Sequence, residues 1–341
     1  MTTRRIIFLI AVLLAVLWLD WRSLTLHASR DLAIDFNVYA RAVSQPISGI
    51  YRQAWPMPFL YPPTAILLFK PVSLLPAGFV IWTVLSIAAF GAAVATVAGW
   101  RAAILSFLSQ SAVKGLIVGQ APMLLGAAMF VGLRLAGFTG GAIWGAAATI
   151  KPQLMLFAPL AMLVRRDWKL LSGMVAGAAA MVLASIMLFG FQPWIDWVAA
   201  VNRFGEQRLL GGAVIWTVTP IGKAILVGLP PLPFLLVSVG IATCAVIVGA
   251  RRLENEQLIA LIVAASLIAS PYAYIHDAIA LIPACVILML KGRWWAAIPA
   301  AMILIGTPFL TMTGLMAGLM LVAAWPLIEK RRGASPSSAK D

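Results

Sequence analysis

Charged residues are scarce in this sequence, and their scarcity excludes a soluble fold. Only 11% of the 341 residues are charged, whereas 62% are hydrophobic, and the mean hydropathy is +0.99. An ordinary soluble domain carries about 25% charged residues, which cover its core. The sequence therefore predicts an all-α, polytopic transmembrane bundle.

Cysteine and histidine are also rare, with two of each. Cys244 and Cys285 lie in apolar runs without ligand spacing, so neither a disulfide framework nor a metal site is expected. The sequence has no G-x-S-x-G elbow, H-E-x-x-H motif or Walker loop, and no D-x-D pair that would hold a metal on a nucleotide sugar. Several catalytic classes therefore lack support, and we expect no cofactor.

Acidic residues are fewer than basic ones, 11 against 25, and the formal net charge is +14. The basic residues stand mostly singly or in pairs between apolar segments and form no basic stripe. This distribution is typical of topology determinants and of contacts with anionic lipid. We therefore expect no nucleic-acid partner.

Apolar segments fill nearly the whole chain, and a span needs about 20 residues. With charge used to place the loops, the sequence predicts about twelve membrane spans. We expect them near 6–24, 77–99, 102–118, 121–134, 136–150, 153–165, 170–190, 231–250, 257–272, 278–290, 294–311 and 313–328.

The basic loops place both termini in the cytoplasm, because inner loops are rich in lysine and arginine. The first apolar run lacks a signal cleavage site, so we interpret it as a retained span in a cell inner membrane or plasma membrane. Residues 1–329 are expected to form a single transmembrane domain, and 330–341 a disordered cytoplasmic tail.

Two polar segments, near 25–62 and 191–230, are predicted to lie on the outer side and to form surface helices there. The apolar stretch 63–75 is short and bounded by prolines, which indicates a helix of partial depth. The glycines between 137 and 145 fall within a predicted span, where small residues permit close helix packing.

One carboxylate in the first outer segment could act as a general base. Asp35 and Tyr39 are four residues apart and share one face of a predicted helix. A carboxylate in a partly desolvated cleft can accept the proton of an attacking hydroxyl. The alternative is a solvated loop carboxylate paired with Arg30 or Arg41.

Three further residues lie at predicted outer helix ends. Tyr61 follows an aromatic stretch that could contact a sugar or a prenyl chain, or belong to an interfacial belt. Gln120 could donate to phosphate or sugar oxygens, or satisfy backbone groups at a helix end. Lys151 could offset the charge of a phosphate leaving group, or extend to water.

His276 and Asp277 stand side by side in an otherwise apolar span, where polar groups are costly unless they pair or meet a substrate. Functional use is the favoured interpretation. If the segment continued helically after Pro271, Tyr272 and His276 would share a face, as would Tyr274 and Asp277. His276 could donate to phosphate or orient the base.

Taken together, these segments resemble glycosyltransferase family 87 of the GT-C membrane class. The resemblance rests on the order of several short motifs from the first outer loop to the ninth span: Asp35-Phe-Asn-Val-Tyr39, Gly49-Ile-Tyr51, Tyr61-Pro62-Pro63, Gly119-Gln120, Lys151-Pro152-Gln153, Ser270-Pro271 and His276-Asp277.

The resemblance implies an inverting enzyme of GT-C type that transfers a hexose, typically mannose, at the extracytoplasmic face. The donor would be a polyprenyl-phosphate sugar, and the acceptor a lipid or glycan hydroxyl. Asp35, rather than Asp31, would be the general base. Lys151, His276, Gln120, Tyr61 and Asp277 would bind the donor phosphate or its sugar, without a metal.

Two other classes compete with this interpretation. A multi-pass transporter or lipid-linked sugar flippase also uses many short helices, but transporters place ionisable residues near the bilayer midplane. The predicted spans are nearly uncharged at their centres, which favours chemistry at the surface. A non-catalytic assembly partner would leave Lys151 and the His276-Asp277 pair without a purpose.

Overall fold

The computed structural model describes residues 3–52, 58–208, 215–291 and 294–324, except for the side chains of 27–30, 205–208, 255, 291 and 294–295. No strand occurs in this part of the chain, although Thr217 and Tyr274 form an isolated antiparallel bridge. The first half contains α1 (Thr3–Asp31), α2 (Ile34–Ser44), η1 (Ile47–Arg52), α3 (Thr64–Ser73), α4 (Gly78–Ala98), α5 (Trp100–Ser106), α6 (Gln110–Val118), α7 (Pro122–Leu135), α8 (Gly137–Ile150) and η2 (Pro152–Leu154).

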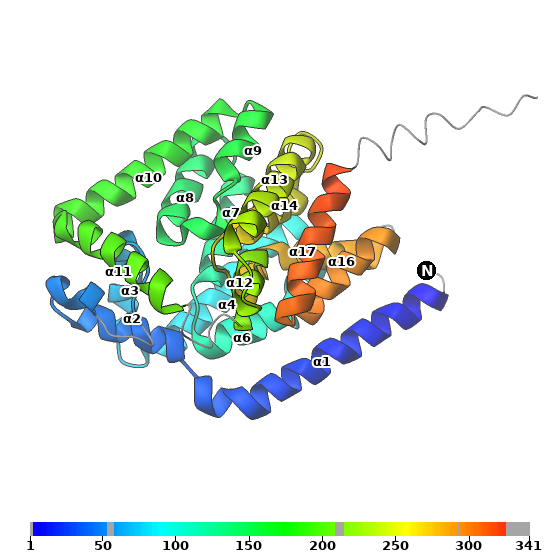
Figure 1. Ribbon diagram of the computed structural model, residues 1–341, viewed down its shortest axis with the longest axis horizontal. Helices are drawn as coiled ribbons and strands as arrows, with labels where there is room; N and C mark the ends of the chain where they lie inside the picture. Colours follow the sequence, from blue (N-terminus) through cyan, green and yellow to red (C-terminus); the bar gives the residue numbers. More distant parts are fainter. Residues whose placement is uncertain (1–2, 53–57, 209–214, 292–293, 325–341) are drawn as a thin grey trace, which may run out of the picture.

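The second half continues as a series of helices, several of them short (Figure 1). Its elements are α9 (Ala158–Arg165), α10 (Trp168–Phe189), α11 (Gln192–Arg208), α12 (Pro220–Leu226), α13 (Pro231–Gly249), α14 (Asn255–Ala269), η4 (Ile275–Leu281), α15 (Ile282–Lys291), α16 (Trp294–Ile305) and α17 (Pro308–Ala323).

Four of the described helices, α1, α4, α10 and α13, are long and apolar enough to cross a membrane. A fifth span exists if α5 and α6, bent by 61° at their junction, count as one. Six shorter apolar helices of 10–17 residues accompany them. The helices support a multi-pass membrane protein with four or five candidate spans, and the number near twelve stays a prediction.

The expected ranges agree with the long helices, but several shorter ones differ. The range 102–118 is divided by the bend between α5 and α6, and 153–165 contains η2 and only eight residues of α9. The predicted boundary near 312 is wrong, because α16 ends at Ile305 and α17 begins at Pro308. Gly306, with φ of +70°, reverses the chain there, a conformation that glycine adopts readily.

Close glycine packing joins α8 and α10, as the glycine-rich sequence predicts. A Cβ atom at Gly141 or Gly145 would collide with backbone of α10, and one at Gly173 or Gly177 would collide with backbone of α8. Small residues on both helices therefore let the two backbones touch.

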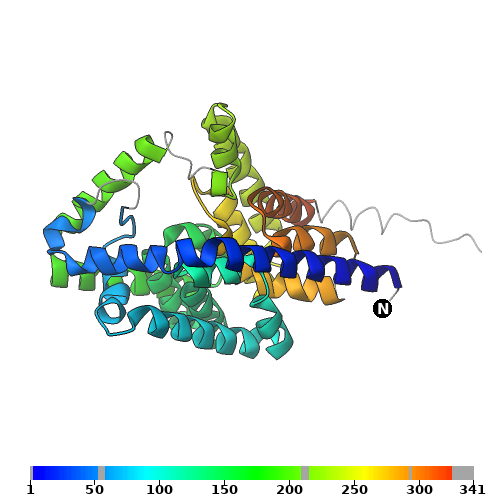
Figure 2. The same ribbon diagram turned by 90° about the horizontal axis from the view of Figure 1, so that it is seen from below.

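The long helix α1 lies along the outside of the bundle, and Figure 2 shows it crossing the face seen from below. Its buried Asp20 accepts a hydrogen bond from Gln110 Nε2, and Ser23 donates to Gln110 Oε1 over 3.1 Å. Because α1 is otherwise largely exposed, this polar contact fixes it against α6. No motif in the sequence pointed to Asp20 or Gln110.

The two predicted outer segments meet in the structure. They form α2 and η1 in the first, and α11 and α12 in the second, and η1 contacts both α2 and α11. Figure 1 shows α2, α3 and α11 gathered on one side of the molecule. The expected tail 330–341 lies outside the described residues.

Candidate active site

The junction of α2 with α6 positions Asp35. Ala33, at φ of +57°, donates its N–H to the Ile117 carbonyl over 2.7 Å, and this contact fixes the start of α2 beside the end of α6. Gly119 has φ of +77°, and a Cβ there would lie 2.7 Å from Phe36 Cβ. Only glycine permits this close approach, which brings Asp35 next to Gln120.

Gln120 connects the carboxylate to a cation. Its Nε2 donates to Asp35 Oδ2 over 2.6 Å, and its Oε1 accepts from Tyr61 Oη over 2.8 Å. The Lys151 ammonium approaches the same Oε1 at 3.4 Å. A single side-chain amide therefore has Asp35 on its nitrogen side and Lys151 on its oxygen side.

Lys151 is held by a buried ion pair. It is 5% exposed, Asp277 is 1% exposed, and the ammonium donates to Asp277 Oδ1. The other carboxylate oxygen, Oδ2, accepts the N–H of Tyr274 over 3.0 Å. Lys151 Nζ also lies 5.6 Å from the centre of the Tyr61 ring, within the range of a cation–π contact.

His276 lies beside this ion pair, with its ring nitrogen Nε2 near Asp277. Its Nε2 is buried and makes no hydrogen bond with any described residue, and it lies 3.9 Å from Asp277 Oδ1. An orphaned buried donor or acceptor costs about 1–3 kcal/mol. A ligand oxygen near His276 would remove that cost.

Aromatic rings form one wall of the site. Tyr39 stacks on Phe69 with ring centroids 4.0 Å apart, and Phe59, Tyr61 and Trp82 surround the two rings. The hydroxyls of Tyr39 and Tyr61 lie 3.0 Å apart. This packing orients Tyr61 toward Gln120.

Hydrogen bonds from helix α11 hold the segment that carries Tyr61 in place. Trp197 Nε1 donates to the Leu60 carbonyl over 2.9 Å, and Arg203 donates to the Tyr51 carbonyl over 3.0 Å. Tyr51 Oη in turn donates to the Tyr61 carbonyl over 2.9 Å. The segment 191–230 thus holds the segment 25–62 in place through these hydrogen bonds.

Burial changes the chemistry of the Asp35 carboxyl group. Desolvation raises its pKa from 3.8 to about 6, although the Gln120 hydrogen bond and the positive charge of Lys151 act in the opposite direction. Arg41, which the sequence offered as an alternative partner of Asp35, donates to the Asn37 carbonyl of its own helix over 3.3 Å. Asp35 therefore has the pKa of a group that can exchange a proton near neutral pH.

All six residues singled out from the sequence lie in this one network, which we call the Gln120 network: Asp35, Tyr61, Gln120, Lys151, His276 and Asp277. Tyr39 joins it through Tyr61. The segment does not continue helically after Pro271, because Ser270 and Tyr274 are extended and a 3₁₀ helix begins only at Ile275. Among the described residues, no group of three or more His, Cys, Asp and Glu side chains could hold a metal ion.

The fold and this network define a class: a helical, multi-pass membrane protein with a buried ion pair, a half-buried amide and a half-buried carboxylate at the junction of several helices. The model of glycosyltransferase family 87 matches residues 59–271, and the chain belongs to that family. The matched region contains Tyr61, Gln120 and Lys151, whereas Asp35, His276 and Asp277 lie outside it. No curated protein and no solved structure matches the chain.

Proposed function

We propose that this glycosyltransferase is an inverting enzyme of GT-C type that moves a hexose, mannose in the first instance, from a polyprenyl-phosphate donor to a lipid or glycan hydroxyl. The observation that carries the proposal is the Gln120 amide between Asp35 and Lys151. Inversion requires the attacking hydroxyl and the leaving phosphate on opposite faces of the sugar. A base and a cation separated by one amide fit that requirement.

Asp35 accepts the proton of the acceptor hydroxyl. As the acceptor oxygen forms its bond to the anomeric carbon, the bond from that carbon to the phosphate oxygen breaks, and its electron pair stays with the phosphate. General base catalysis of this kind contributes about 10²–10⁴-fold to the rate.

The leaving polyprenyl phosphate gains one negative charge, and Lys151 stabilises it. A cation already fixed in a buried site stabilises developing charge without reorganisation during the reaction. His276 Nε2, which is buried and makes no hydrogen bond with the described residues, donates to a phosphate oxygen. Tyr61 packs beside the sugar or the first prenyl unit.

Asp277 acts as a positioning residue in this scheme. Both of its carboxylate oxygens are engaged, one by Lys151 and one by the Tyr274 backbone, and a negative group would repel phosphate. It therefore holds the Lys151 ammonium in place. In this scheme, and unlike what the family resemblance implied, Asp277 does not contact the donor itself.

The outer side of a cell inner membrane or plasma membrane is the proposed location of the reaction, and residues 1–329 are its single domain. A polyprenyl-phosphate donor suits this location because its lipid keeps the sugar at the membrane surface.

Purified protein supplied with radiolabelled hexose donors tests the donor class. With a total membrane lipid extract as acceptor, we expect label to move from polyprenyl-phosphate mannose and not from a nucleotide-linked mannose. Asp196→Asn is the matched control for Asp35→Asn. Asp196 also accepts a hydrogen bond from a glutamine amide, that of Gln192 over 2.9 Å, but it lies outside the Gln120 network. Transfer from the nucleotide sugar alone would contradict the proposal. Mass spectrometry of lipids and glycans from cells with and without the gene then identifies the acceptor.

A further inference from the structure

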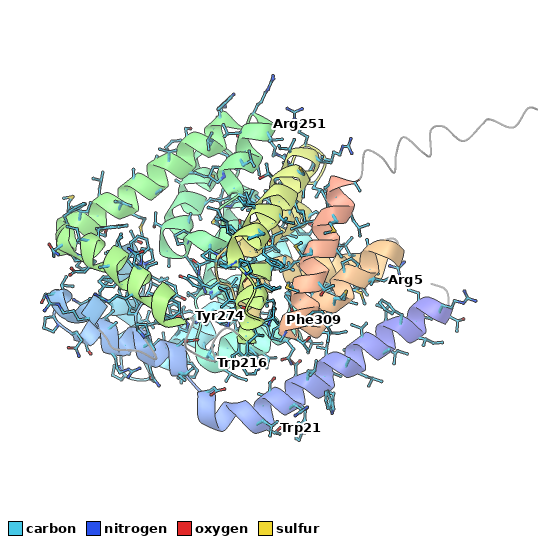
Figure 3. All side chains as sticks on the ribbon, viewed as in Figure 1. Arg5, Trp21, Trp216, Arg251, Tyr274 and Phe309 are labelled. Atoms are coloured by element: carbon cyan, nitrogen blue, oxygen red, sulfur yellow. The ribbon has the colours of Figure 1, made fainter. Side chains whose placement is uncertain are left out.

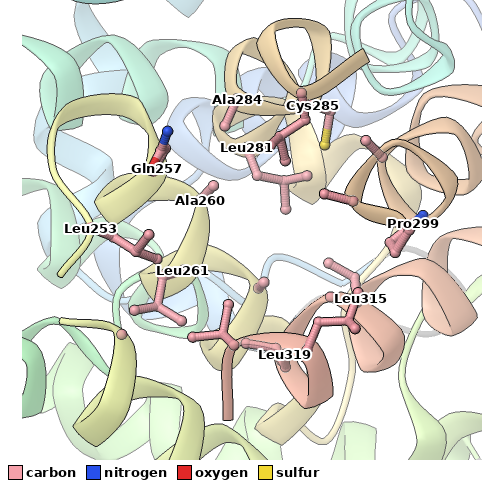
Figure 4. A pocket seen from close by; sticks show the side chains of 18 of the residues that line it. Leu253, Gln257, Ala260, Leu261, Leu281, Ala284, Cys285, Pro299, Leu315 and Leu319 are labelled. Atoms are coloured by element: carbon pink, nitrogen blue, oxygen red, sulfur yellow. The ribbon is translucent and has the colours of Figure 1, made fainter. Parts of the chain in front are cut away.

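An apolar cavity of about 650 Å³ lies among helices of which only η4 also carries residues of the proposed reaction. Residues of α13, α14, η4, α15, α16 and α17 line it, and Figure 4 shows leucines of α14, η4 and α17 facing the same space. Ligand pockets usually measure about 300–1,000 Å³. None of its lining residues belongs to the Gln120 network.

The polar part of the lining is confined to one end of the cavity. Arg252 supplies a positive charge there, and Gln257 supplies an amide. Apart from Cys285, the other lining residues that the structure describes are apolar. Arg252 lies in the turn before α14 and Gln257 in the first turn of that helix, at the opposite end of α14 from Ser270. In Figure 3 Arg251, next to Arg252, lies at the upper edge of the molecule, whereas Tyr274 lies well below it, nearer the middle.

Five cations lie on the two loops next to that end. We call these residues the basic rim: Arg165, Arg166, Lys169, Arg251 and Arg252. The loops that carry it are tied together, because Arg165 donates to the carbonyls of Ala250 and Leu253, each over 3.0 Å, and Arg251 donates to Val164 over 2.9 Å. Three acids lie on the same loops as these five cations: Asp167, which caps α10 by accepting from the Leu170 N–H, and Glu254 and Glu256, which follow Arg252. Positive charge therefore predominates beside the cavity.

We infer that the cavity is a binding site for an anionic phospholipid, with one acyl chain inside and the phosphate headgroup at Arg252 and the basic rim. In a bilayer, acyl chains are the solvent that fills an apolar space, so the chain alone gives little selectivity. The charges at the rim select an anionic headgroup over a zwitterionic one. The site is separate from the proposed donor site, since its polar end lies away from Lys151.

Native mass spectrometry of the detergent-purified full chain tests this inference. The probes are phosphatidylglycerol and phosphatidylcholine with identical acyl chains. We expect retention of phosphatidylglycerol to exceed that of phosphatidylcholine by about fivefold or more. Equal retention of the two lipids would overturn the assignment of the headgroup.

Two pairs of variants separate the chain from the headgroup. Gly318→Leu places a side chain in the cavity, where a Cβ would meet only Pro299 at 4.0 Å, and Gly240→Leu adds the same side chain on α13, where nothing lies within 4 Å. Arg252→Gln removes the charge that lines the cavity, and Arg134→Gln removes an exposed one at the end of α7. We expect the first member of each pair to lower phosphatidylglycerol retention about fivefold and the second to leave it unchanged.

The unfolding temperature of each variant shows whether a loss of lipid reflects misfolding. Gly318→Ala, which leaves most of the cavity empty, should retain the lipid. If folded Gly318→Leu protein retains phosphatidylglycerol as the wild type does, the chain does not occupy this cavity and the inference is wrong. The readout is bound lipid, so its outcome does not depend on the proposed transfer reaction.

Discussion

Asp35 owes its proposed reactivity to competing effects on one carboxyl group. Burial raises its pKa to about 6, and this change outweighs the Gln120 hydrogen bond and the charge of Lys151. The proposed base is the ionised form. We therefore expect the transfer rate at saturating donor to rise with pH, with a midpoint near 6, and to fall about tenfold per pH unit below it. Donor binding should show no change at that midpoint, and a flat rate between pH 5 and 8 would contradict the role of Asp35.

The same pKa shift has a consequence for stability. Because the folded-state pKa lies above the ordinary value of 3.8, the folded protein binds this proton more tightly than the unfolded chain does. The stabilising contribution is present below pH 4 and is lost as the pH rises through 6. Replacing Asp35 by asparagine should therefore leave the unfolding temperature at pH 7 unchanged or raise it.

Lys151 and Asp277 are expected to behave as a unit in unfolding. Lys151→Met leaves Asp277 as an uncompensated buried charge, which costs about 3–5 kcal/mol. Adding Asp277→Leu removes that charge, so the double variant should recover most of the lost stability, measured by thermal unfolding in detergent. It should still lack transfer activity, because the cation for the phosphate is absent.

The control for this pair is Lys223→Met, since Lys223 donates to the Ile215 carbonyl and lies outside the Gln120 network. Its transfer rate should equal that of the wild type. A double variant that regained activity would show that Lys151 has a structural role only.

At the scale of elements, the contact between α2 and α6 decides how Asp35 meets Gln120. Gly119→Ala introduces both a strained positive φ and a collision with Phe36. Gly228→Ala introduces a similar strain, at φ of +73°, with nothing within 4 Å. We expect each to cost about 1 kcal/mol of stability from backbone strain, but only Gly119→Ala to lower the transfer rate, by about tenfold or more. Equal rates in the two variants would mean that the contact does not position the base.

The long spans could be predicted from hydrophobic length. The helix that carries Asp35 and Tyr39 could be predicted from the spacing of these residues. The segment 270–277 could not, because its extended backbone pairs Val218 with Ala273 through a 2.8 Å hydrogen bond, and that partner is distant in sequence. Asp20 and Gln110 were missed for a similar reason: they lie 90 residues apart in the sequence, and only packing shows that they meet.

The order of the polar residues along the chain indicated which ones belong together, but it gave no geometry. Sequence reasoning treated Gln120 and Asp277 as donor contacts. In the structure Gln120 lies between Asp35 and Lys151, and Asp277 forms an ion pair with Lys151. Such assignments depend on distances between five separate segments, and spacing within a segment does not determine them.

At the scale of the whole molecule, the close pairing of α8 and α10 supports the chain around Lys151. Gly177→Val would force apart helices whose backbones touch. Overpacking of this kind costs about 1–3 kcal/mol, which for a chain of this length predicts a fall in unfolding temperature of about 1–4 °C. Gly240→Val, on a face of α13 with nothing within 4 Å, should leave the unfolding temperature unchanged, and a similar fall in both variants would contradict this account of the packing.

The central claim is that the helices bring together a base and a phosphate-binding cation for glycosyl transfer. Its most direct test compares Asp35→Asn with the wild type in one preparation, measuring both binding and turnover of polyprenyl-phosphate mannose. We predict unchanged donor affinity, an intact fold and a transfer rate lowered about 10²–10⁴-fold. A variant that binds the donor and transfers mannose at the wild-type rate would contradict the account.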